Sequence, residues 1–320
     1  MERYLYGNKE HLTSKESIMT DQEKEYLKQA LQMPLDFKIK KAIAMLQSYK
    51  ELTDASTPPV LCFSGGKDSV CIKALADMAG IEYQAIYSVT SIDPPELVRF
   101  IKRHHPDVKF SYKIDPRSGK IDSFFRHMIE YGVFPTRINR WCCDVFKHNA
   151  VHHDIKIIGV RAAESSARAN RWKPVTRWNN GKELVLAPIL YFTDEDVWNF
   201  IKQNNLPYCE LYDQGFKRLG CIGCPMASAE MKAREFARWP RYEQLYRKTF
   251  AEIWKRRAGT ISRTTGKEWF GSRKFHNSDE LFEWWLGGKS SPDDLLKIND
   301  ESISDCQLDA NGDYCTMGMH

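Results

Sequence analysis

The run Ser64-Gly65-Gly66-Lys67-Asp68-Ser69 has the residue types and spacing of a phosphate-binding loop. Its paired glycines allow backbone N–H groups to turn inward around an anion, and Lys67 adds a positive charge. A short apolar run precedes the loop and a helical pattern follows it, so a helix N-terminus would present further unpaired donors to the same anion. The spacing is not that of a Walker A loop, G-x-x-x-x-G-K-S/T. The alternative is a glycine turn that only connects a strand to a helix.

Four cysteines in two pairs, Cys142-Cys143 and Cys221-x-x-Cys224, have the spacing of metal ligands. Four thiolates can close around tetrahedral zinc or an iron–sulfur cluster. Adjacent cysteines usually point apart, so a shared centre needs an unusual turn, which a cluster with separated corners tolerates better than one zinc ion. Unliganded or redox-active thiols are the remaining alternative. The total of nine cysteines is odd and no secretion signal precedes them, which argues against a disulfide framework.

Arginines near these features suit phosphate or sulfate oxygens, because the planar guanidinium group matches such anions. Arg161 and Arg168 follow a predicted buried strand, at the strand end where α/β sheets usually bind ligands. Arg171 follows them in the sequence, and it fits a surface residue as well as it fits an anion ligand. Asp93 and Glu96 have the chemistry to hold magnesium or a ribose, although both suit the start of a helix equally well.

The elements that must position these residues alternate between apolar strands and helices, which indicates an α/β fold with a parallel twisted sheet and helices on both faces. Strands are predicted at residues 60–63, 81–89, 108–114, 155–160 and 184–189. Helices are predicted at 70–78, ending at Gly80, at 95–105, and at 197–204, capped by Thr193. One or two amphipathic helices precede them between residues 21 and 50. Cys62 and Cys71 are expected to be small core residues.

Changes in composition divide the chain into four segments. These are a helical segment at 1–56, an α/β domain with the paired cysteines at 57–226, a basic, aromatic, helical region at 227–290 and an acidic tail at 291–320. Residues 217–274 hold 15 basic and 5 acidic residues, whereas residues 278–320 hold 2 basic and 10 acidic ones. The basic residues suit nucleic-acid phosphates, and the interleaved aromatics suit stacking on unpaired bases. Aromatics every three or four residues fit equally the core face of a helix.

The composition excludes two broad classes of protein. A hydrophobic content of 42% and a charged content of 28% argue against a chain that is mainly disordered or embedded in a membrane. No stretch approaches the roughly 20 apolar residues of a membrane helix, and the first ten residues do not form a secretion signal. We therefore expect a cytoplasmic protein with no membrane partner.

The loop from Ser64 to Ser69 resembles the PP-loop of ATP pyrophosphatases, which cleave ATP between the α and β phosphates and adenylate a substrate. Residues 90–96 and 159–165, with Arg168, resemble the phosphoadenylyl-sulfate (PAPS) reductase family, so that the likeness covers residues 59–226. It implies an adenine nucleotide alpha hydrolase-like fold that binds ATP and Mg2+. Nucleotide contacts are then expected from Ser64, Gly65, Gly66, Lys67, Asp68, Ser69, Arg161 and Arg168. Lys67 and Asp68 are the catalytic candidates, and Lys67 would stabilise the charge of the transferring group.

The two cysteine pairs resemble the 4Fe-4S ligands of the assimilatory adenylyl-sulfate (APS) reductase branch. This resemblance implies that Cys142, Cys143, Cys221 and Cys224 are the ligands of one cluster. Reductases of this kind also carry a mobile C-terminal cysteine nucleophile within Glu-Cys-Gly-Leu/Ile-His. Cys315 is its counterpart here, although the glutamate and the following glycine are replaced. The present chain keeps the Gly-Gly-Lys-Asp core that sulfonucleotide reductases usually lack.

These features predict an iron–sulfur enzyme that cleaves ATP to AMP and pyrophosphate and adenylates an acceptor for sulfur transfer. The combination resembles the DndC-type proteins of DNA phosphorothioation, which implies a nucleic acid as acceptor and a cysteine desulfurase or thioredoxin-like protein as donor. One alternative is a PAPS or APS reductase that forms sulfite with Cys315 as nucleophile. Another is a non-catalytic, cluster-bearing protein that binds nucleic acid.

Overall fold

The computed structural model describes residues 20–52, 57–137, 139–148, 154–178, 183–261 and 275–287. Six strands form one sheet in the order β3-β2-β1-β4-β6-β5. Their bounds are β1 Val60–Cys62, β2 Gln84–Val89, β3 Lys109–Tyr112, β4 Ile155–Ile157, β5 Val175–Trp178 and β6 Glu183–Leu186. The edge strand β5 pairs antiparallel with β6, and the other pairings within the sheet are parallel.

The strand β1 lies where the order of the strands in the sheet reverses. Val60 and Leu61 of this strand are fully buried, and β1 pairs with β2 on one side and β4 on the other. The chain leaves β1 toward β2 and β3, and it returns on the opposite side as β4. Such a reversal opens a crevice at the carboxyl ends of the two central strands, where open α/β sheets bind ligands. The predicted phosphate loop and Arg161 follow these two strand ends.

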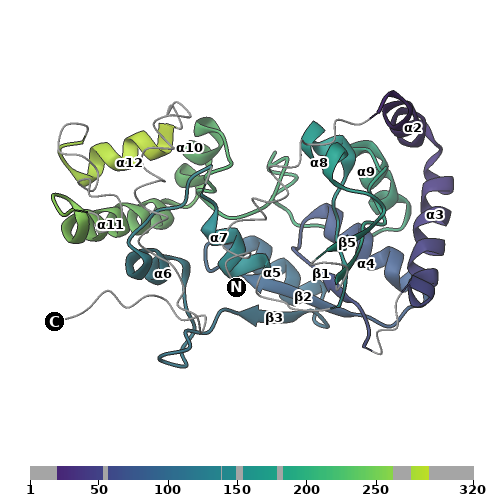
Figure 1. Cartoon of the computed structure of the whole chain (residues 1–320), viewed down its shortest axis with the longest axis horizontal. Coiled ribbons are helices and arrows are strands. Elements are labelled where there is room, and N and C mark those ends of the chain that lie inside the picture. The colour runs from purple at the N-terminus through teal and green to yellow at the C-terminus, as the bar shows by residue number, and fades with distance from the viewer. Residues whose placement is uncertain are drawn as a thin grey trace.

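One group of helices surrounds the sheet (Figure 1). Its members are α2 Asp21–Gln32, α3 Leu35–Gln47, the 3-10 helix η1 Ser48–Leu52, α4 Lys67–Ala79, α5 Pro95–His104, the 3-10 helix η3 Ala162–Glu164, α8 Ser166–Arg171 and α9 Asp194–Gln203. Both α3 and α9 pack against α4, the helix that follows the phosphate loop. The helix α4 ends at Gly80, whose φ of 65° lies in the left-handed region that glycine adopts easily.

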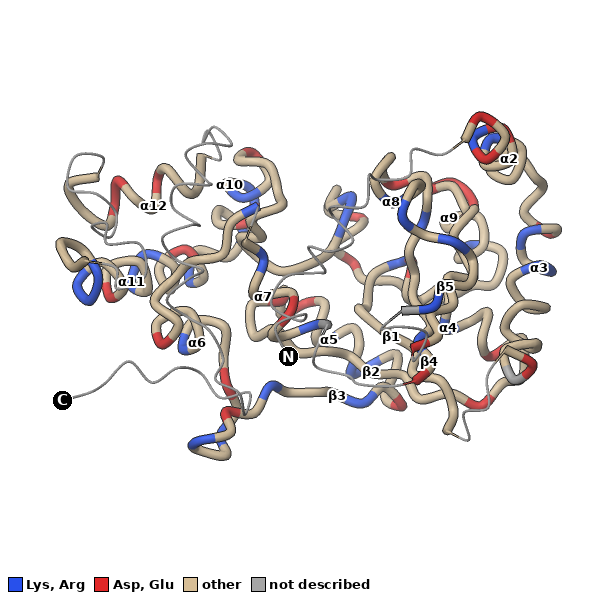
Figure 2. Tube along the Cα trace, in the orientation of Figure 1, with Lys and Arg blue, Asp and Glu red and all other residues tan. Residues whose placement is uncertain are grey.

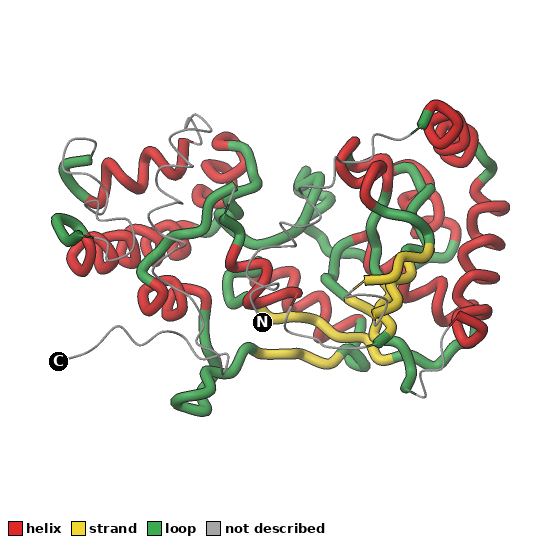
Figure 3. The backbone as a smooth tube through the Cα atoms, in the orientation of Figure 1, coloured by secondary structure: helices red, strands yellow, loops and turns green. Residues whose placement is uncertain are grey.

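A second group of helices lies beside the sheet and contains no strand among its described residues (Figure 3). Its members are α6 Phe124–Tyr131, α7 Trp141–Cys143, the π-helix η2 Asp144–His148, α10 Ala229–Arg238, α11 Pro240–Arg257 and α12 Ser278–Gly287. Tyr246 at its centre is fully buried against the rings of Phe124, Phe236 and Trp285. One cluster of buried residues joins these helices to those around the sheet.

The structure confirms the α/β fold, with the five predicted strands present and helices around the sheet. The two helices predicted between residues 21 and 50 are α2 and α3, and Pro34 separates them. The antiparallel edge strand β5 was absent from the prediction, because Val175-Thr176-Arg177-Trp178 is too short to show a clear alternation. The division of the chain at residues 56, 226 and 290 stays a prediction. No helix in the described part of the chain is long and apolar enough to cross a lipid bilayer.

Candidate functional site

The loop Ser64 to Gly66 connects β1 to α4, as the sequence predicts. Gly65 has a φ of 75°, and a Cβ atom there would lie 2.7 Å from Leu97 Cδ1, so glycine alone fits between the loop and α5. Ser69 Oγ donates to the carbonyl of Gly66 at 2.8 Å, and Ser64 Oγ donates to Ser69 Oγ at 3.3 Å. These hydrogen bonds hold both ends of the loop against the first turn of α4.

Four charged side chains form a closed ring beside this loop, which we call the charge ring: Lys67, Asp68, Arg161 and Asp194. Lys67 Nζ lies 3.3 Å from Asp68 Oδ2 and 3.0 Å from Asp194 Oδ1. Arg161 binds the same two carboxylates, with Nε 2.6 Å from Asp68 Oδ1 and Nη2 3.0 Å from Asp194 Oδ1. Partial burial raises the pKa of Asp194, but the hydrogen bonds and charges of Lys67 and Arg161 outweigh it and hold that pKa below its ordinary value.

The strand end after β4 brings Arg161 to the loop. A Cβ atom at Gly159 would lie 3.2 Å from the backbone carbonyl of Asp68, so a small residue is needed where this strand end passes α4. Arg161 then precedes η3, and its backbone N–H donates to Glu164 at 3.1 Å. The predicted neighbourhood of Lys67, Asp68 and Arg161 is therefore present in the structure.

Two residues at this site, Asp194 and Tyr212, were missed in the sequence. Asp194 follows the predicted cap Thr193 and is the first residue of α9. The hydroxyl of Tyr212 accepts the backbone N–H of Lys67 at 2.9 Å, and its ring packs edge-on against Trp198. No local signal identifies such residues, because they follow the loop by more than a hundred positions and reach it only through the fold.

Arg168, which was predicted to contact the nucleotide, forms an ion pair with Glu164. It is linked to Arg161 through this carboxylate, and its role toward a nucleotide stays a prediction. The carboxylate of Asp93 accepts the backbone N–H and the hydroxyl of Thr90 at 3.1 and 2.7 Å. Glu96 accepts Arg238 at 2.9 Å and the indole N–H of Trp239 at 3.1 Å. Glu96 lies in the first turn of α5, as the helix-start alternative predicts, whereas Asp93 precedes the helix and its cap. A role of either acid toward magnesium or ribose stays a prediction.

The four cysteines predicted as ligands line one cavity. Cys142 and Cys143 end the short helix α7, which continues directly into the π-helix η2. A π-helical turn is wider than an α-helical turn and often occurs at functional sites, and here it begins at Asp144, directly after the two cysteines. Besides the four cysteines, the residues that line the cavity are Thr90, Ile92, Phe124, Phe146, Lys147, Pro225 and Tyr246.

Several hydrogen bonds hold the Cys221 to Cys224 turn in position. Ile222 N–H donates to the carbonyl of Ile92 at 2.8 Å, and Tyr246 Oη donates to the carbonyl of Ile222 at 3.0 Å. Gly223 N–H donates to Glu235 Oε2 at 2.8 Å. Gly223 has a φ of 69°, and a Cβ atom there would lie 2.8 Å from the Tyr246 ring. The turn therefore has little freedom to move away from the cavity.

Burial affects the chemistry of these thiols. Burial raises the pKa of Cys221 to about 11, and a hydrogen bond to Cys143 together with burial raises the pKa of Cys142 well above its usual range. A metal centre at this cavity would therefore have to displace thiol protons. Within the described ranges, no group of three or more His, Cys, Asp or Glu side chains is arranged to hold a metal ion.

Of the other cysteines, Cys71 is completely buried in α4, as predicted, and Cys209 is also buried. Burial raises the pKa of Cys62 to about 11. The candidate nucleophile Cys315 and Cys306 lie outside the described residues.

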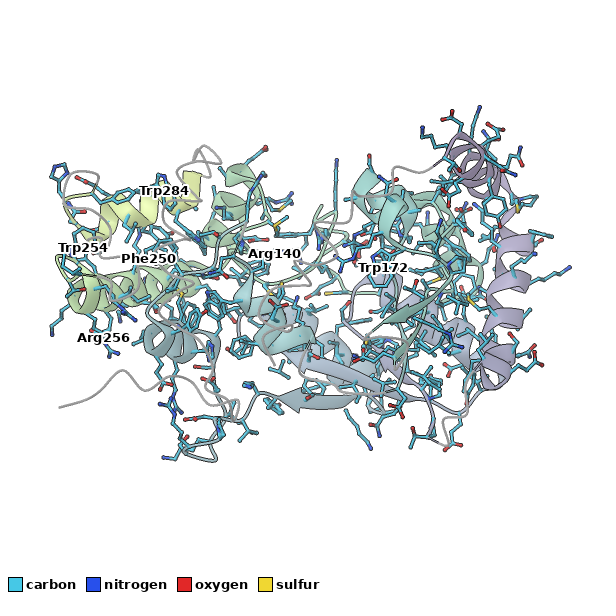
Figure 4. The ribbon with its side chains drawn as sticks, viewed as in Figure 1. Arg140, Trp172, Phe250, Trp254, Arg256 and Trp284 are labelled. Carbon is cyan, nitrogen blue, oxygen red and sulfur yellow. The ribbon has the colours of Figure 1, made fainter. Side chains whose placement is uncertain are left out.

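Three further arginines, Arg137, Arg140 and Arg171, lie between the phosphate loop and the second cysteine pair in the sequence. Arg137 donates to the carbonyls of Pro225 and Ala227 at 3.3 and 3.4 Å, and so joins the segment before the first cysteine pair to the turn of the second. Arg140 lies beside α7, and Trp172 lies beside α8 (Figure 4). Burial, and then the charge of Arg140, lowers the pKa of Arg171, so these two cations are near enough to interact.

The aromatic side chains of the basic region form a helical core. Phe236, Tyr246 and Phe250 are buried, and Phe250 and Trp284 come from the adjoining helices α11 and α12 (Figure 4). Basic and acidic residues alternate along α11 (Figure 2), and Arg247 pairs with Glu283 of α12 at 2.6 Å. The structure thus favours the core interpretation, since these buried rings are unavailable for stacking on bases.

Comparison of the sequence with known protein families identifies the family of this chain. The phosphoadenosine phosphosulfate reductase domain matches residues 58–227, and the chain belongs to that family. An uncharacterized protein of Methanocaldococcus jannaschii is 29% identical over 204 residues, which cover 59% of this chain and 42% of that protein. Adenosine 5'-phosphosulfate reductase of Staphylococcus epidermidis is 34% identical over 83 residues, which cover 26% of this chain and 34% of that protein. The chain thus spans less than half the length of these curated relatives.

One solved structure with a similar arrangement is the phosphate complex of phosphoadenylyl-sulfate reductase from Candida auris. It is 16% identical, has a TM-score of 0.41, and matches 58% of this chain and 93% of its own. Another is FMN adenylyltransferase from Candida glabrata in complex with FAD and inorganic pyrophosphate. It is 17% identical, has a TM-score of 0.40, and matches 62% of this chain and 68% of its own.

Proposed function

We propose that the protein binds ATP with Mg2+ at the loop Ser64 to Ser69, cleaves it to AMP and pyrophosphate, and adenylates an acceptor for sulfur transfer. The observation that carries this proposal is the position of Lys67. Lys67 is 5% exposed, shares both carboxylates of the charge ring with Arg161, and begins the helix α4 after the carboxyl end of β1. Two buried cations next to a helix N-terminus are suited to the negative charge of a polyphosphate.

The proposed reaction requires charge stabilisation more than covalent chemistry from the protein. An acceptor oxygen attacks the α-phosphorus, the bond to the bridging oxygen breaks, and pyrophosphate leaves while the acceptor proton passes to solvent. Lys67 and Arg161 stabilise the charge that develops on the transferring and leaving groups. Asp68 has the oxygen ligands that Mg2+ prefers and lies within the same ring. A persulfide on a donor protein then displaces AMP from the adenylated acceptor, and a thiol reductant breaks the remaining sulfur–sulfur bond to the donor.

We further propose that Cys142, Cys143, Cys221 and Cys224 hold a 4Fe-4S cluster. The donor set fits the group, because four thiols from two chain segments surround one cavity whose lining is mostly apolar. Two pairs of thiols from separate chain segments match the four-cysteine ligation of such a cluster. Such a cluster supplies electron transfer or a site for sulfur when bound.

Substitution of Lys67 tests the nucleotide part of this proposal. Lys67→Ala is expected to weaken ATP binding at least tenfold in isothermal titration calorimetry, because one buried cation of the site is removed. Lys73→Ala is the matched control, since Lys73 lies further along α4 and pairs with Asp77 and Asp107 instead. Equal ATP affinity in the Lys67→Ala variant and the wild type would contradict the proposal.

The cluster part is tested by iron and sulfide analysis of protein purified without oxygen. Cys221→Ala is expected to lose most of its iron and sulfide, whereas Cys71→Ala, which removes a buried thiol from the core instead of the cavity, keeps them. Equal iron content in the two variants would contradict the assignment of these ligands.

A second candidate function is the reduction of PAPS or APS to sulfite. It is favoured by the adenosine 5'-phosphosulfate reductases among the relatives and by the paired cysteines. In that reaction Cys315 would attack the sulfate sulfur and release the nucleotide, and a thiol reductant would then release sulfite. Sulfite formation from APS or PAPS that disappears in Cys315→Ser would establish this function in place of ATP cleavage.

A further inference from the structure

The charge ring is electrically neutral, although the proposed ligand is a polyanion. Its two cations, Lys67 and Arg161, are each bonded to both of its carboxylates, Asp68 and Asp194. A phosphate oxygen that approaches Lys67 or Arg161 therefore meets cations whose charge is already balanced. A ligand can form ion pairs with these cations without competition only after one of the two carboxylates has moved away from them.

Asp194 is the carboxylate that can leave. Its side chain is 64% exposed, whereas the side chain of Asp68 is 24% exposed. Asp194 is also the first residue of α9, so its carboxylate can turn into solvent when a ligand takes over its contacts with Lys67 and Arg161. Asp68 lies in the first turn of α4, behind the loop, and packs against the strand end at Gly159.

A second acceptor from the same part of the chain contacts the loop. The backbone N–H of Lys67 donates a hydrogen bond to the hydroxyl of Tyr212. A phosphate oxygen bound at the loop would accept this hydrogen bond instead. Asp194 and Tyr212 thus satisfy an ammonium, a guanidinium and a backbone amide that the proposed function assigns to phosphate. These are the partners that an anionic ligand would need.

We propose that Asp194 is an internal competitor for the phosphate site: its carboxylate occupies Lys67 and Arg161 until a polyphosphate displaces it. This inference rests on the proposed function, since it concerns the same cations. It predicts that the site binds polyphosphate less tightly than its two buried cations would allow. Asp194 then sets the concentration of ligand at which the site fills.

Asp194→Asn is the direct test, because it removes the charge and keeps the size of the side chain. The net charge of the ring changes from zero to plus one, and the ion pairs that compete with the ligand are lost. Inorganic pyrophosphate is the probe, and its binding to the full chain is measured by isothermal titration calorimetry without divalent metal. The expected result is a dissociation constant about tenfold lower than in the wild type.

Glu195→Gln is the matched control. Glu195 is the next residue of α9, is exposed, and makes no ion pair with another described residue. Its substitution removes the same charge from the same helix N-terminus, so it reports any general effect of charge or of helix stability. The control is expected to change the dissociation constant by less than about twofold, as appropriate for an exposed charge outside the contact.

The outcomes separate this inference from the proposed function. Pyrophosphate binding that is lost in Lys67→Met but is unchanged or weaker in Asp194→Asn would overturn the role of Asp194 alone. Equal gains in Asp194→Asn and Glu195→Gln would also overturn it, because the effect would then be general electrostatics. Absence of binding in the wild type and in Asp194→Asn would overturn both the inference and the phosphate site.

Discussion

Substitution of Gly65 by alanine tests how the phosphate loop is held against the sheet. Gly65 has a φ of 75°, and an added Cβ would lie 2.7 Å from Leu97 Cδ1 and 2.8 Å from Ile101 Cδ1 and Cγ1. Both neighbours are almost completely buried in α5, so they cannot move toward solvent. The left-handed conformation costs about 1–2 kcal/mol for alanine, and overpacking adds about 1–3 kcal/mol. The expected loss in the free energy of unfolding is therefore about 2–5 kcal/mol.

Gly80→Ala separates these two contributions. Gly80 has a φ of 65°, but nothing lies within 4 Å of an added Cβ, so only the backbone cost of about 1–2 kcal/mol applies. Urea unfolding followed by tryptophan fluorescence gives both free energies on the same protein. If Gly65→Ala and Gly80→Ala destabilise the protein equally, the close contact between the loop and α5 is refuted. A larger loss for Gly65→Ala, together with weaker ATP binding, supports it.

Three further predictions concern other parts of the structure. Gly223→Ala is expected to lose bound iron, because its Cβ would lie 2.8 Å from the Tyr246 ring. Gly220→Ala is the control and is expected to keep the iron, because nothing lies within 4 Å of its Cβ. Equal iron content in the two variants would show that the close contact at Gly223 does not hold this turn. Asp196→Ala leaves the buried side chain of Lys38 without its carboxylate and is expected to cost about 3–5 kcal/mol in urea unfolding. A loss below about 1 kcal/mol would show that the pair is not buried in solution. Burial lowers the pKa of His105 to about 4 in the folded protein. Between pH 6.5 and 4 the unfolded chain therefore binds more protons than the folded chain, so the stability present above pH 6.5 is lost as the pH falls through that range. His105→Phe keeps the ring contact with Phe63 and should reduce this fall in the urea midpoint, and an unchanged pH profile would disprove the assignment.

The parts of the fold that the sequence predicts are those governed by local patterns. Val60 to Phe63 is a continuous apolar run followed by Gly65 and Gly66, which identifies a buried parallel strand and the loop after it. The capping residues Thr193 and Gly80 likewise identify helix ends in their own neighbourhood. Strand β5 is the exception, since its pairing with β6 depends on a partner strand and not on its own pattern.

The candidate site was predicted only where the residue types are themselves unusual. The two cysteine pairs predict the ligands of one metal centre, and the structure places all four around one cavity, while the centre itself stays a prediction. The contacts of Asp194 and Tyr212 with Lys67 depend on how α9 and the following turn pack on α4. Aspartate at a helix start and tyrosine in a turn are ordinary in sequence, so tertiary packing alone gives them a place in the site.

A single assay shows whether this protein both carries a cluster and cleaves ATP at the α–β bond. Protein purified without oxygen is analysed for iron and sulfide and is then incubated with α-labelled ATP and Mg2+, with and without DNA or RNA. We expect iron and sulfide in the purified protein, and release of AMP and pyrophosphate that is lost in Lys67→Ala. Cluster-loaded protein that releases neither product under any of these conditions would contradict this expectation.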